Sequence, residues 1–201
     1  MKAQLQMNEK IASAKKIAVL QVSTLEDSLF ACEELLKSGV NAIEIPYRNQ
    51  EFFSLSDSCI SEIKKRFPEI LLGGATVINP LLAERAFSSG ADFILSPGLN
   101  EETVLWCREK NLPCYPGVIT PSEIENALRL ELSVLKLFPV ENFGGISYLK
   151  ALKGPFPDVK FIVSGGINFE NEREYENFPN VLAVSGSYLL KGIKKINHER
   201  F

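Results

Sequence analysis

The sequence contains a single histidine, His198, which stands close to the C-terminal end. This scarcity argues against a serine–histidine–aspartate triad, a histidine-rich zinc site and a histidine general base in the core. Any chemistry must then come from lysine, arginine, acidic or hydroxyl side chains, or from the backbone. We therefore expect neither a metal ion nor another cofactor.

Cysteine is also sparse, and Cys32, Cys59, Cys107 and Cys114 form no C-x-x-C pair. Scattered thiols of this kind are typical of reduced cysteines in a cytoplasmic protein. No apolar run is long enough to span a membrane. The polar segment 1–16 lacks the apolar centre of a secretory signal and is predicted to form a short amphipathic helix. We expect a cytoplasmic protein without a membrane partner.

Charge of one sign is not in excess, because the formal net charge is −3. Nothing therefore favours nucleic acid or an anionic membrane as a partner, and an anionic substrate would be held by local groups. Hydrophobic residues make up 45% and charged residues 23% of the 201 positions, a balance typical of globular proteins. No linker or low-complexity tract interrupts the chain, so we predict one domain over residues 1–201.

What the sequence does contain is a recurring pair of segments, a short apolar β-branched run followed by an amphipathic stretch. Several amphipathic stretches follow helix-capping residues, and two of them begin with proline. The capping residues are Thr24, Asn79, Asn100 and Thr120, before helix-like segments 25–38, 80–89, 101–110 and 121–130. The strand-like runs are residues 16–23, 42–48, 71–77, 93–97, 114–119, 134–139, 161–165 and 181–186.

This alternation predicts parallel strands joined by crossover helices. Eight strands in a chain of 201 residues match a closed (β/α)8 TIM barrel of minimal size. An open doubly wound sheet is the competing architecture, but it usually has a glycine-rich turn after the first strand. Here Ser23, Thr24 and Leu25 occupy that place. The pattern favours the barrel.

Two predicted strands carry a charge in their middle, Lys136 in one and Glu44 in the other. Strands of a parallel barrel are covered on both faces and should be apolar throughout. Side chains alternate along a strand, so Lys136 faces away from Leu135 and Leu137, and Glu44 is expected to face the same way as Arg48. If the leucines pack on the helices, Lys136 points into the barrel and would pair with Glu44.

A lysine inside a barrel suits imine chemistry. An amine attacks a ketone only when unprotonated, and burial or a neighbouring cation favours that form. Glu44 would then transfer protons, and Arg48 would bind a substrate carboxylate through two parallel hydrogen bonds. Two other interpretations stay open: a buried ion pair without chemistry, and a misassigned strand whose charge faces solvent.

Glycine-rich segments follow the last two predicted strands. Gly165 and Gly166 follow the seventh, and Gly186 and Ser187 end the eighth. In this fold the backbone at these two places commonly cradles a phosphate. Thr76, at the end of the third strand, and Pro97, at the end of the fourth, mark the same edge. For all of these positions, ordinary turn chemistry is the alternative.

These motifs together resemble the 2-keto-3-deoxy-6-phosphogluconate (KDPG) aldolases, which include enzymes that also cleave 4-hydroxy-2-oxoglutarate (KHG). The resemblance runs from about residue 16 to residue 190. An ordered set of motifs carries it: Gly39-Val40, Ile43-Glu44-Ile45, Gly73-Gly74-Ala75-Thr76-Val77, Asn79-Pro80, Ser96-Pro97-Gly98, Pro116-Gly117-Val118, Lys136-Leu137-Phe138-Pro139, Lys153-Gly154-Pro155-Phe156, Gly165-Gly166 and Gly186-Ser187.

The resemblance implies a metal-free class I mechanism with Lys136 as the imine-forming lysine and Glu44 as the proton-transferring group. It implies that Arg48 and Thr76 hold the pyruvate carboxylate and that Pro97 lines the pyruvoyl pocket. Phosphate binding would fall to Gly165, Gly166, Gly186 and Ser187. The implied reaction is the reversible cleavage of KDPG, a phosphorylated keto acid, to pyruvate and glyceraldehyde 3-phosphate. The implied assembly is a cytoplasmic homotrimer.

The chain departs from the family pattern in two places. Gln21 stands where relatives often carry an arginine, which leaves the substrate open between KDPG, its galactonate counterpart and KHG. After the last strand, relatives continue into a longer helix. We therefore expect a truncated C-terminal helix, with cover from the N-terminal segment or a neighbouring subunit. A phosphosugar isomerase, epimerase or decarboxylase, and a non-catalytic keto-acid sensor, remain as alternative functions.

Overall fold

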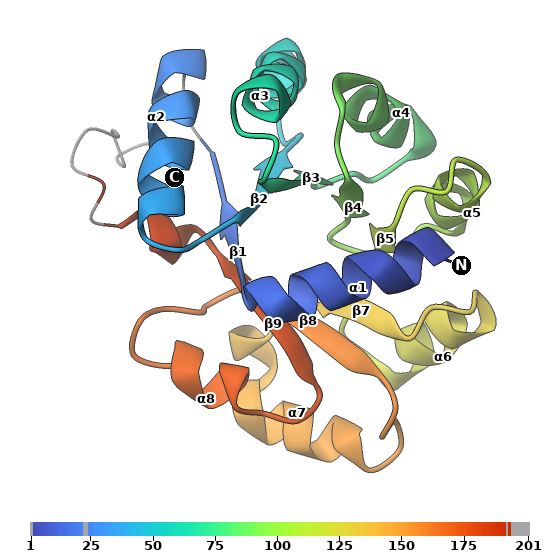
Figure 1. Cartoon of the computed structure of the whole chain (residues 1–201). Coiled ribbons are helices and arrows are strands. Elements are labelled where there is room, and N and C mark those ends of the chain that lie inside the picture. The colour runs from blue at the N-terminus through green and yellow to red at the C-terminus, as the bar shows by residue number, and fades with distance from the viewer. Residues whose placement is uncertain (1, 22–23, 192, 194–201) are drawn as a thin grey trace.

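The computed structural model describes residues 2–21, 24–191 and 193. All strand pairs in it are parallel, and helices alternate with strands along the chain (Figure 1). The strands are β1 (Lys16–Val19), β2 (Ala42–Pro46), β3 (Leu71–Ala75), β4 (Phe93–Leu95), β5 (Cys114–Tyr115), β6 (Gly117–Val118), β7 (Val134–Leu137), β8 (Lys160–Ser164) and β9 (Val181–Gly186). The helices are α1 (Lys2–Ala14), α2 (Leu25–Lys37), α3 (Phe53–Arg66), α4 (Pro80–Ser89), α5 (Glu101–Glu109), α6 (Pro121–Arg129), α7 (Gly145–Lys153) and α8 (Glu172–Glu176).

The sheet closes on itself at Pro116. Its strand order is β5-β4-β3-β2-β1-β9-β8-β7-β6, so the two ends of the sheet are consecutive in the chain. The predicted fifth strand is thus divided into β5 and β6, because proline has no N–H to continue a ladder. The carbonyl of Pro116 still accepts a hydrogen bond from the Lys136 N–H, at 2.9 Å. The predicted (β/α)8 barrel is confirmed.

The predicted helix starts are confirmed at atomic detail. The side chains of Thr24, Asn79, Asn100 and Thr120 each accept a hydrogen bond from a backbone N–H in the first turn. Thr120 forms a reciprocal capping box with Glu123. Such caps stabilise a helix by about 1 kcal/mol each. They also fix where each loop at the carboxyl edge of the barrel gives way to its helix.

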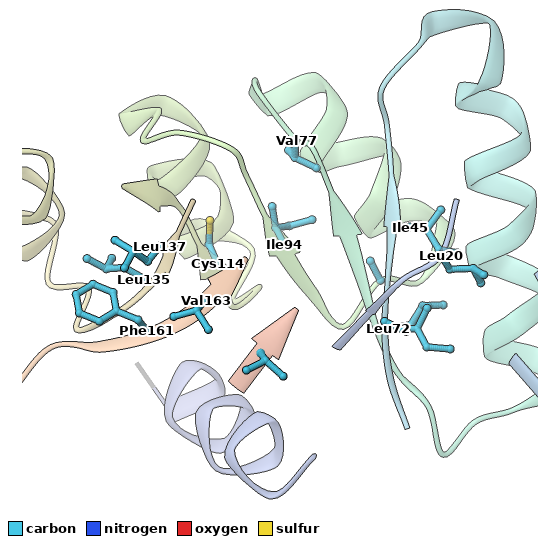
Figure 2. Packing of buried hydrophobic residues seen from close by; sticks show 14 of the residues in the cluster. Leu20, Ile45, Leu72, Val77, Ile94, Cys114, Leu135, Leu137, Phe161 and Val163 are labelled. Atoms are coloured by element: carbon cyan, nitrogen blue, oxygen red, sulfur yellow. The ribbon is translucent and has the colours of Figure 1, made fainter. Parts of the chain in front are cut away.

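Two apolar layers pack against the strands, one outside the barrel and one in its interior. The outer layer lies between strands and helices and includes Leu135 and Leu137 (Figure 2). The inner layer fills the amino-terminal half of the barrel, where Met7 and Ile11 of α1 join Ile17 and side chains from the other strands. Figure 1 shows α1 crossing this end of the barrel. The N-terminal helix predicted from the sequence therefore acts as a plug.

The interior of the barrel is narrow. A Cβ atom added to Gly73 would lie 2.4 Å from the ring of Phe93, a distance at which one of the two groups must move. Phe93 packs edge-on against Tyr115, with ring centroids 6.0 Å apart. Apolar side chains thus fill the lower barrel, and only its carboxyl end is left for polar groups.

Some predicted bounds are wrong or fall outside the described residues. The second strand ends at Pro46, before Arg48, although the Tyr47 N–H still donates a hydrogen bond to the Ala75 carbonyl of β3. The first strand ends at Val19, and Val22 and Ser23 lie outside the described residues. After β9 the chain forms a short 3-10 helix, η3 (Ser187–Leu190), and residues 194–201, where a truncated last helix was expected, are also outside. No helix in the described part is long and apolar enough to cross a membrane.

Candidate active site

Lys136 and Glu44 meet inside the barrel. Lys136 is the third residue of β7 and Glu44 the third residue of β2, strands that stand on opposite sides of the ring. The Lys136 Nζ lies 3.4 Å from the Glu44 Oε1, and the two side chains are only 9% and 2% exposed. The prediction that the two charges pair in the interior is confirmed.

Strand alternation places both side chains there. Val134, two residues before Lys136, and Ala42, two residues before Glu44, both belong to the inner apolar layer. Side chains two apart share a face, so the two charged groups continue the same inward row one step nearer the carboxyl end. Leu135 and Leu137 face the helices, as Figure 2 shows. The alternation of the sequence alone therefore sets the direction of Lys136.

Sequence reasoning missed one partner of Glu44. Ser185, a fully buried residue of β9, has its Oγ 3.1 Å from the Glu44 Oε1. The other carboxylate oxygen, Oε2, is buried and accepts no hydrogen bond from residues 2–21, 24–191 or 193. The available signal was again alternation, because Ser185 follows the inward-facing Ala183 by two residues.

An aromatic ring borders the lysine. The Lys136 Nζ lies 5.6 Å from the centroid of the Phe138 ring. An aromatic face at this distance attracts a cation, whether an ammonium or a protonated imine. Because Phe138 follows the end of β7, the ring forms part of the wall at the barrel mouth.

Arg48 lies beyond the end of β2, whereas the sequence placed it inside that strand. It follows the end of β2 by two residues, is exposed, and its guanidinium donates a hydrogen bond to the side-chain oxygen of Gln21. β1 and β2 are neighbours, so both residues stand on the same rim of the barrel. Gln21 stands where relatives often carry an arginine. It contacts Arg48, the residue that the family resemblance implies for carboxylate binding.

Thr76 and Pro97 stand on the same rim. Thr76 directly follows β3, is partly buried, and has a positive φ of 58°, which is uncommon for a residue with a side chain. Pro97 follows β4 by two residues and is partly buried. Both residues therefore stand at the carboxyl edge of the barrel, the edge at which active sites of this fold lie.

The glycine pair after β8 adopts backbone conformations that residues with a side chain rarely adopt. Gly165 and Gly166 have φ values of 92° and 88°. A Cβ on Gly166 would lie 2.4 Å from the Cβ of Glu141, so the backbone approaches that residue closely. Gly186 ends β9, and Ser187 beside it is exposed. Two adjacent strand ends thus present small residues at one part of the rim.

The comparisons with known proteins agree with this geometry. The profile of the KDPG and KHG aldolase family matches residues 7–201. The chain belongs to this family. The 2-dehydro-3-deoxy-phosphogluconate aldolase of Haemophilus influenzae is 34% identical over 186 residues, which are 92% of this chain and 86% of that protein. The KHG/KDPG aldolase of Escherichia coli K12 is 34% identical over 87% of this chain and 80% of its own.

Solved structures extend the agreement to three dimensions. The KDPG aldolase of Legionella pneumophila, with pyruvate captured as a covalent carbinolamine intermediate, has a TM-score of 0.86 and 33% identity over 92% of this chain and 88% of its own. A 3-keto-L-gulonate-6-phosphate decarboxylase from Vibrio cholerae shares the fold, with a TM-score of 0.67 at 16% identity over 85% of this chain and 86% of its own. Within the described residues of this KDPG/KHG family member, no three His, Cys, Asp or Glu side chains gather where they could hold a metal ion.

Proposed function

We propose that this chain is a class I aldolase that reversibly cleaves KDPG to pyruvate and glyceraldehyde 3-phosphate through an imine on Lys136. The observation that carries the proposal is the buried Lys136–Glu44 pair at the carboxyl end of the barrel interior. The Legionella relative supports it, because a carbinolamine is the first adduct between an amine and the ketone of pyruvate.

The chemistry follows from the positions of these two groups. The Lys136 amine attacks the C2 ketone, and loss of water gives a protonated imine that draws electrons from the neighbouring carbon. The C3–C4 bond then breaks as the C4 hydroxyl loses its proton, which releases glyceraldehyde 3-phosphate and leaves an enamine. Protonation at C3 and hydrolysis release pyruvate. Glu44 is the carboxylate within reach of Lys136 for these proton transfers.

The rim residues would bind the rest of the substrate. Arg48 and Thr76 would hold the carboxylate of the pyruvoyl group, with Pro97 against its apolar side. The backbone at Gly165, Gly166 and Gly186, with the exposed Ser187 hydroxyl, would hold the phosphate. The whole site then lies within one domain, residues 1–201. We infer further a cytoplasmic homotrimer.

A second activity is the cleavage of KHG to pyruvate and glyoxylate. It needs the same imine and carboxylate site but no phosphate contact, and the E. coli relative is named for both substrates. Pyruvate release should be measured on KDPG, on its galactonate counterpart and on KHG. A Ser187→Ala variant should lose rate on the two phosphorylated substrates and keep it on KHG, if the exposed Ser187 hydroxyl binds phosphate.

Borohydride trapping tests the central claim. Incubating the protein with pyruvate and borohydride should reduce the imine and leave a stable adduct on Lys136, located by mass spectrometry of peptides. Lys136→Arg keeps the positive charge but forms no imine, so it should show neither adduct nor turnover. Turnover retained in Lys136→Arg would favour an isomerase, epimerase or decarboxylase. Absence of an adduct on folded wild-type protein would reject the imine mechanism.

A further inference from the structure

The carboxylate of Glu44 is held from one side only. Its Oε1 lies 3.1 Å from the Ser185 hydroxyl and 3.4 Å from the Lys136 ammonium. Its Oε2 is buried and receives no hydrogen bond from any described residue. We propose that Ser185 is a positioning residue that anchors Oε1 of Glu44, so that Oε2 is the oxygen that exchanges protons with the substrate. The inference rests on the proposed imine mechanism.

A carboxylate needs such an anchor because the last torsion of a glutamate side chain is broad and nearly two-fold. Without a donor on one oxygen, Oε1 and Oε2 would interchange and the carboxylate plane would turn. Of the two donors present, Lys136 changes its chemistry during turnover. An ammonium offers three N–H donors, whereas a protonated imine offers one in a fixed plane. Ser185 is the donor that stays the same throughout the cycle.

The register of the strands fixes the position of Ser185 relative to Glu44. Ser185 pairs in register with Ile17 of β1 on one side and with Ser164 of β8 on the other. Glu44 pairs with Val19, so β1 is the single strand between Ser185 and Glu44. Since Ser185 is fully buried, water does not compete for its hydroxyl. The hydrogen bond is therefore built into the closed barrel.

The proton step can be written for the free oxygen. In the imine formed with pyruvate, Oε2 takes a proton from C3. The C3–H electron pair becomes the C2=C3 bond, and the C2=N pair moves to the Lys136 nitrogen. In the reverse direction Oε2 returns the proton to C3 of the enamine. Ser185 donates to Oε1 in both states, and it does not touch the substrate.

Three variants test this role. Ser185→Ala removes the donor, and Ser185→Thr keeps a hydroxyl. Ser28→Ala is the matched control, since among the described residues its buried hydroxyl contacts the Thr24 carbonyl and the Cys59 thiol, away from Glu44. For each, exchange of the pyruvate methyl protons in deuterated water is followed by NMR. Borohydride trapping on Lys136, and kcat and KM for KDPG, are measured beside it.

We expect Ser185→Ala to slow exchange and kcat by about tenfold or more, the loss typical of one hydrogen bond to a charged group. Trapping and KM should stay within about twofold of wild type, because trapping over a long incubation reports the equilibrium amount of imine and not the rate at which Glu44 moves protons. Ser185→Thr should restore most of the exchange rate, and Ser28→Ala should leave it unchanged. Should Ser185→Ala lose the fold, Ser185→Cys replaces it as a weak donor of similar size.

Two results would overturn the inference and leave the aldolase assignment intact. One is exchange in Ser185→Ala within about twofold of wild type. The other is an equal loss of trapping and exchange, which would give Ser185 a merely structural role. Failure of the proposed function looks different, because wild-type protein itself would then give no adduct on Lys136.

Discussion

Among the described residues, Lys136 and Lys16 both pair with glutamates at low exposure, and the two sites are built differently. Lys136 and Glu44 lie in the barrel interior, with 3.4 Å between Nζ and Oε1 and side chains 9% and 2% exposed. Lys16 and Glu172 join the start of β1 to α8, with 3.0 Å between Nζ and Oε2 and side chains 29% and 11% exposed. The Lys136–Glu44 pair is thus the more buried of the two, but its nitrogen–oxygen distance is the longer.

The two pairs also differ in the further hydrogen bonds and charges that surround them. The Glu172 Oε2 accepts a second hydrogen bond from the Tyr188 hydroxyl at 2.7 Å, and Lys16 lies 3.4 Å from Glu176. Burial lowers the pKa of Lys16, but the hydrogen bond and charges of Glu172 and Glu176 outweigh it, so the pKa is raised. Burial, together with the bond to Glu172, raises the pKa of the Tyr188 hydroxyl.

The difference agrees with the proposal that one pair supports the fold and the other takes part in the chemistry. A buried ion pair repays its lost hydration only with good geometry and further hydrogen bonds. The Lys16–Glu172 pair keeps some contact with water and gains Tyr188 and Glu176. The Lys136–Glu44 pair keeps little water and leaves one carboxylate oxygen without a donor among the described residues. In the proposed mechanism this oxygen exchanges protons with the substrate.

The largest effect is expected at Lys136. Lys136→Met removes the amine while keeping a long apolar side chain, so kcat/KM should fall by about 10⁴-fold or more because no imine can form. Pyruvate release in a coupled assay measures it. Lys16→Met is the matched control at the other pair and should keep full turnover. Equal loss of activity in both variants would erase the distinction between the pairs.

The next effect is expected at Glu44. Glu44→Gln keeps the size and the contact with Ser185 but cannot carry a proton, so kcat should fall by about 10² to 10³-fold. Borohydride labelling of Lys136 should fall less than turnover does, since it reports the imine rather than the later proton transfers. Glu172→Gln serves as the control. Wild-type kcat in Glu44→Gln would show that another group moves the protons.

The two pairs also differ in how far the sequence predicts them. Lys136 and Glu44 could be predicted because a charge in a strand buried on both faces has to find a partner, and the (β/α)8 pattern offers one interior. Helix starts such as Thr120 were predictable because a cap involves neighbours in the chain. The Lys16–Glu172 pair carries no such signal, because a charge at the start of a strand is usually solvated.

The contacts of Ser185 and Gln21 could not be predicted for a related reason. Alternation along β9 gives Ser185 an inward direction, because it follows the inward-facing Ala183 by two residues. Its partner depends on the register of β9, β1 and β2 around the closed ring. Gln21 and Arg48 meet beyond the ends of β1 and β2, where no strand pairing sets the contact in advance. Strand ends and registers are set by long-range packing, which a local pattern does not encode.

The two pairs should also differ in their contribution to the free energy of unfolding, although this effect is smaller than the effects on activity. Replacing both partners of the interior pair, in Lys136→Met with Glu44→Gln, should leave the free energy of unfolding unchanged or raise it by about 1 kcal/mol or more, because the cost of burying two charges disappears. Replacing both partners of the other pair, in Lys16→Met with Glu172→Gln, should lower it by about 1 kcal/mol. Urea denaturation measures both. The reverse order of stabilities would contradict the comparison.

The smallest effect is expected in the pH dependence of the Lys16 pair. The pKa of Lys16 is raised in the folded protein above its ordinary value of 10.5, so the charged form is favoured by folding. The stability from this shift is fully present below pH 10.5 and is lost as the pH rises through the raised value. Because Lys16 is partly exposed, the change should stay below about 1 kcal/mol.

The measurement is the difference in free energy of unfolding between wild type and Lys16→Met as the pH increases. The difference should be constant up to about pH 10 and shrink above it. Tyr188 acts in the same direction, since its raised pKa also makes the folded state lose stability as the pH rises, but it is present in both proteins and largely cancels. A difference that grows with pH would mean that Glu172 and Glu176 do not hold the charge of Lys16. The contrast between the two pairs would then rest on the barrel interior alone.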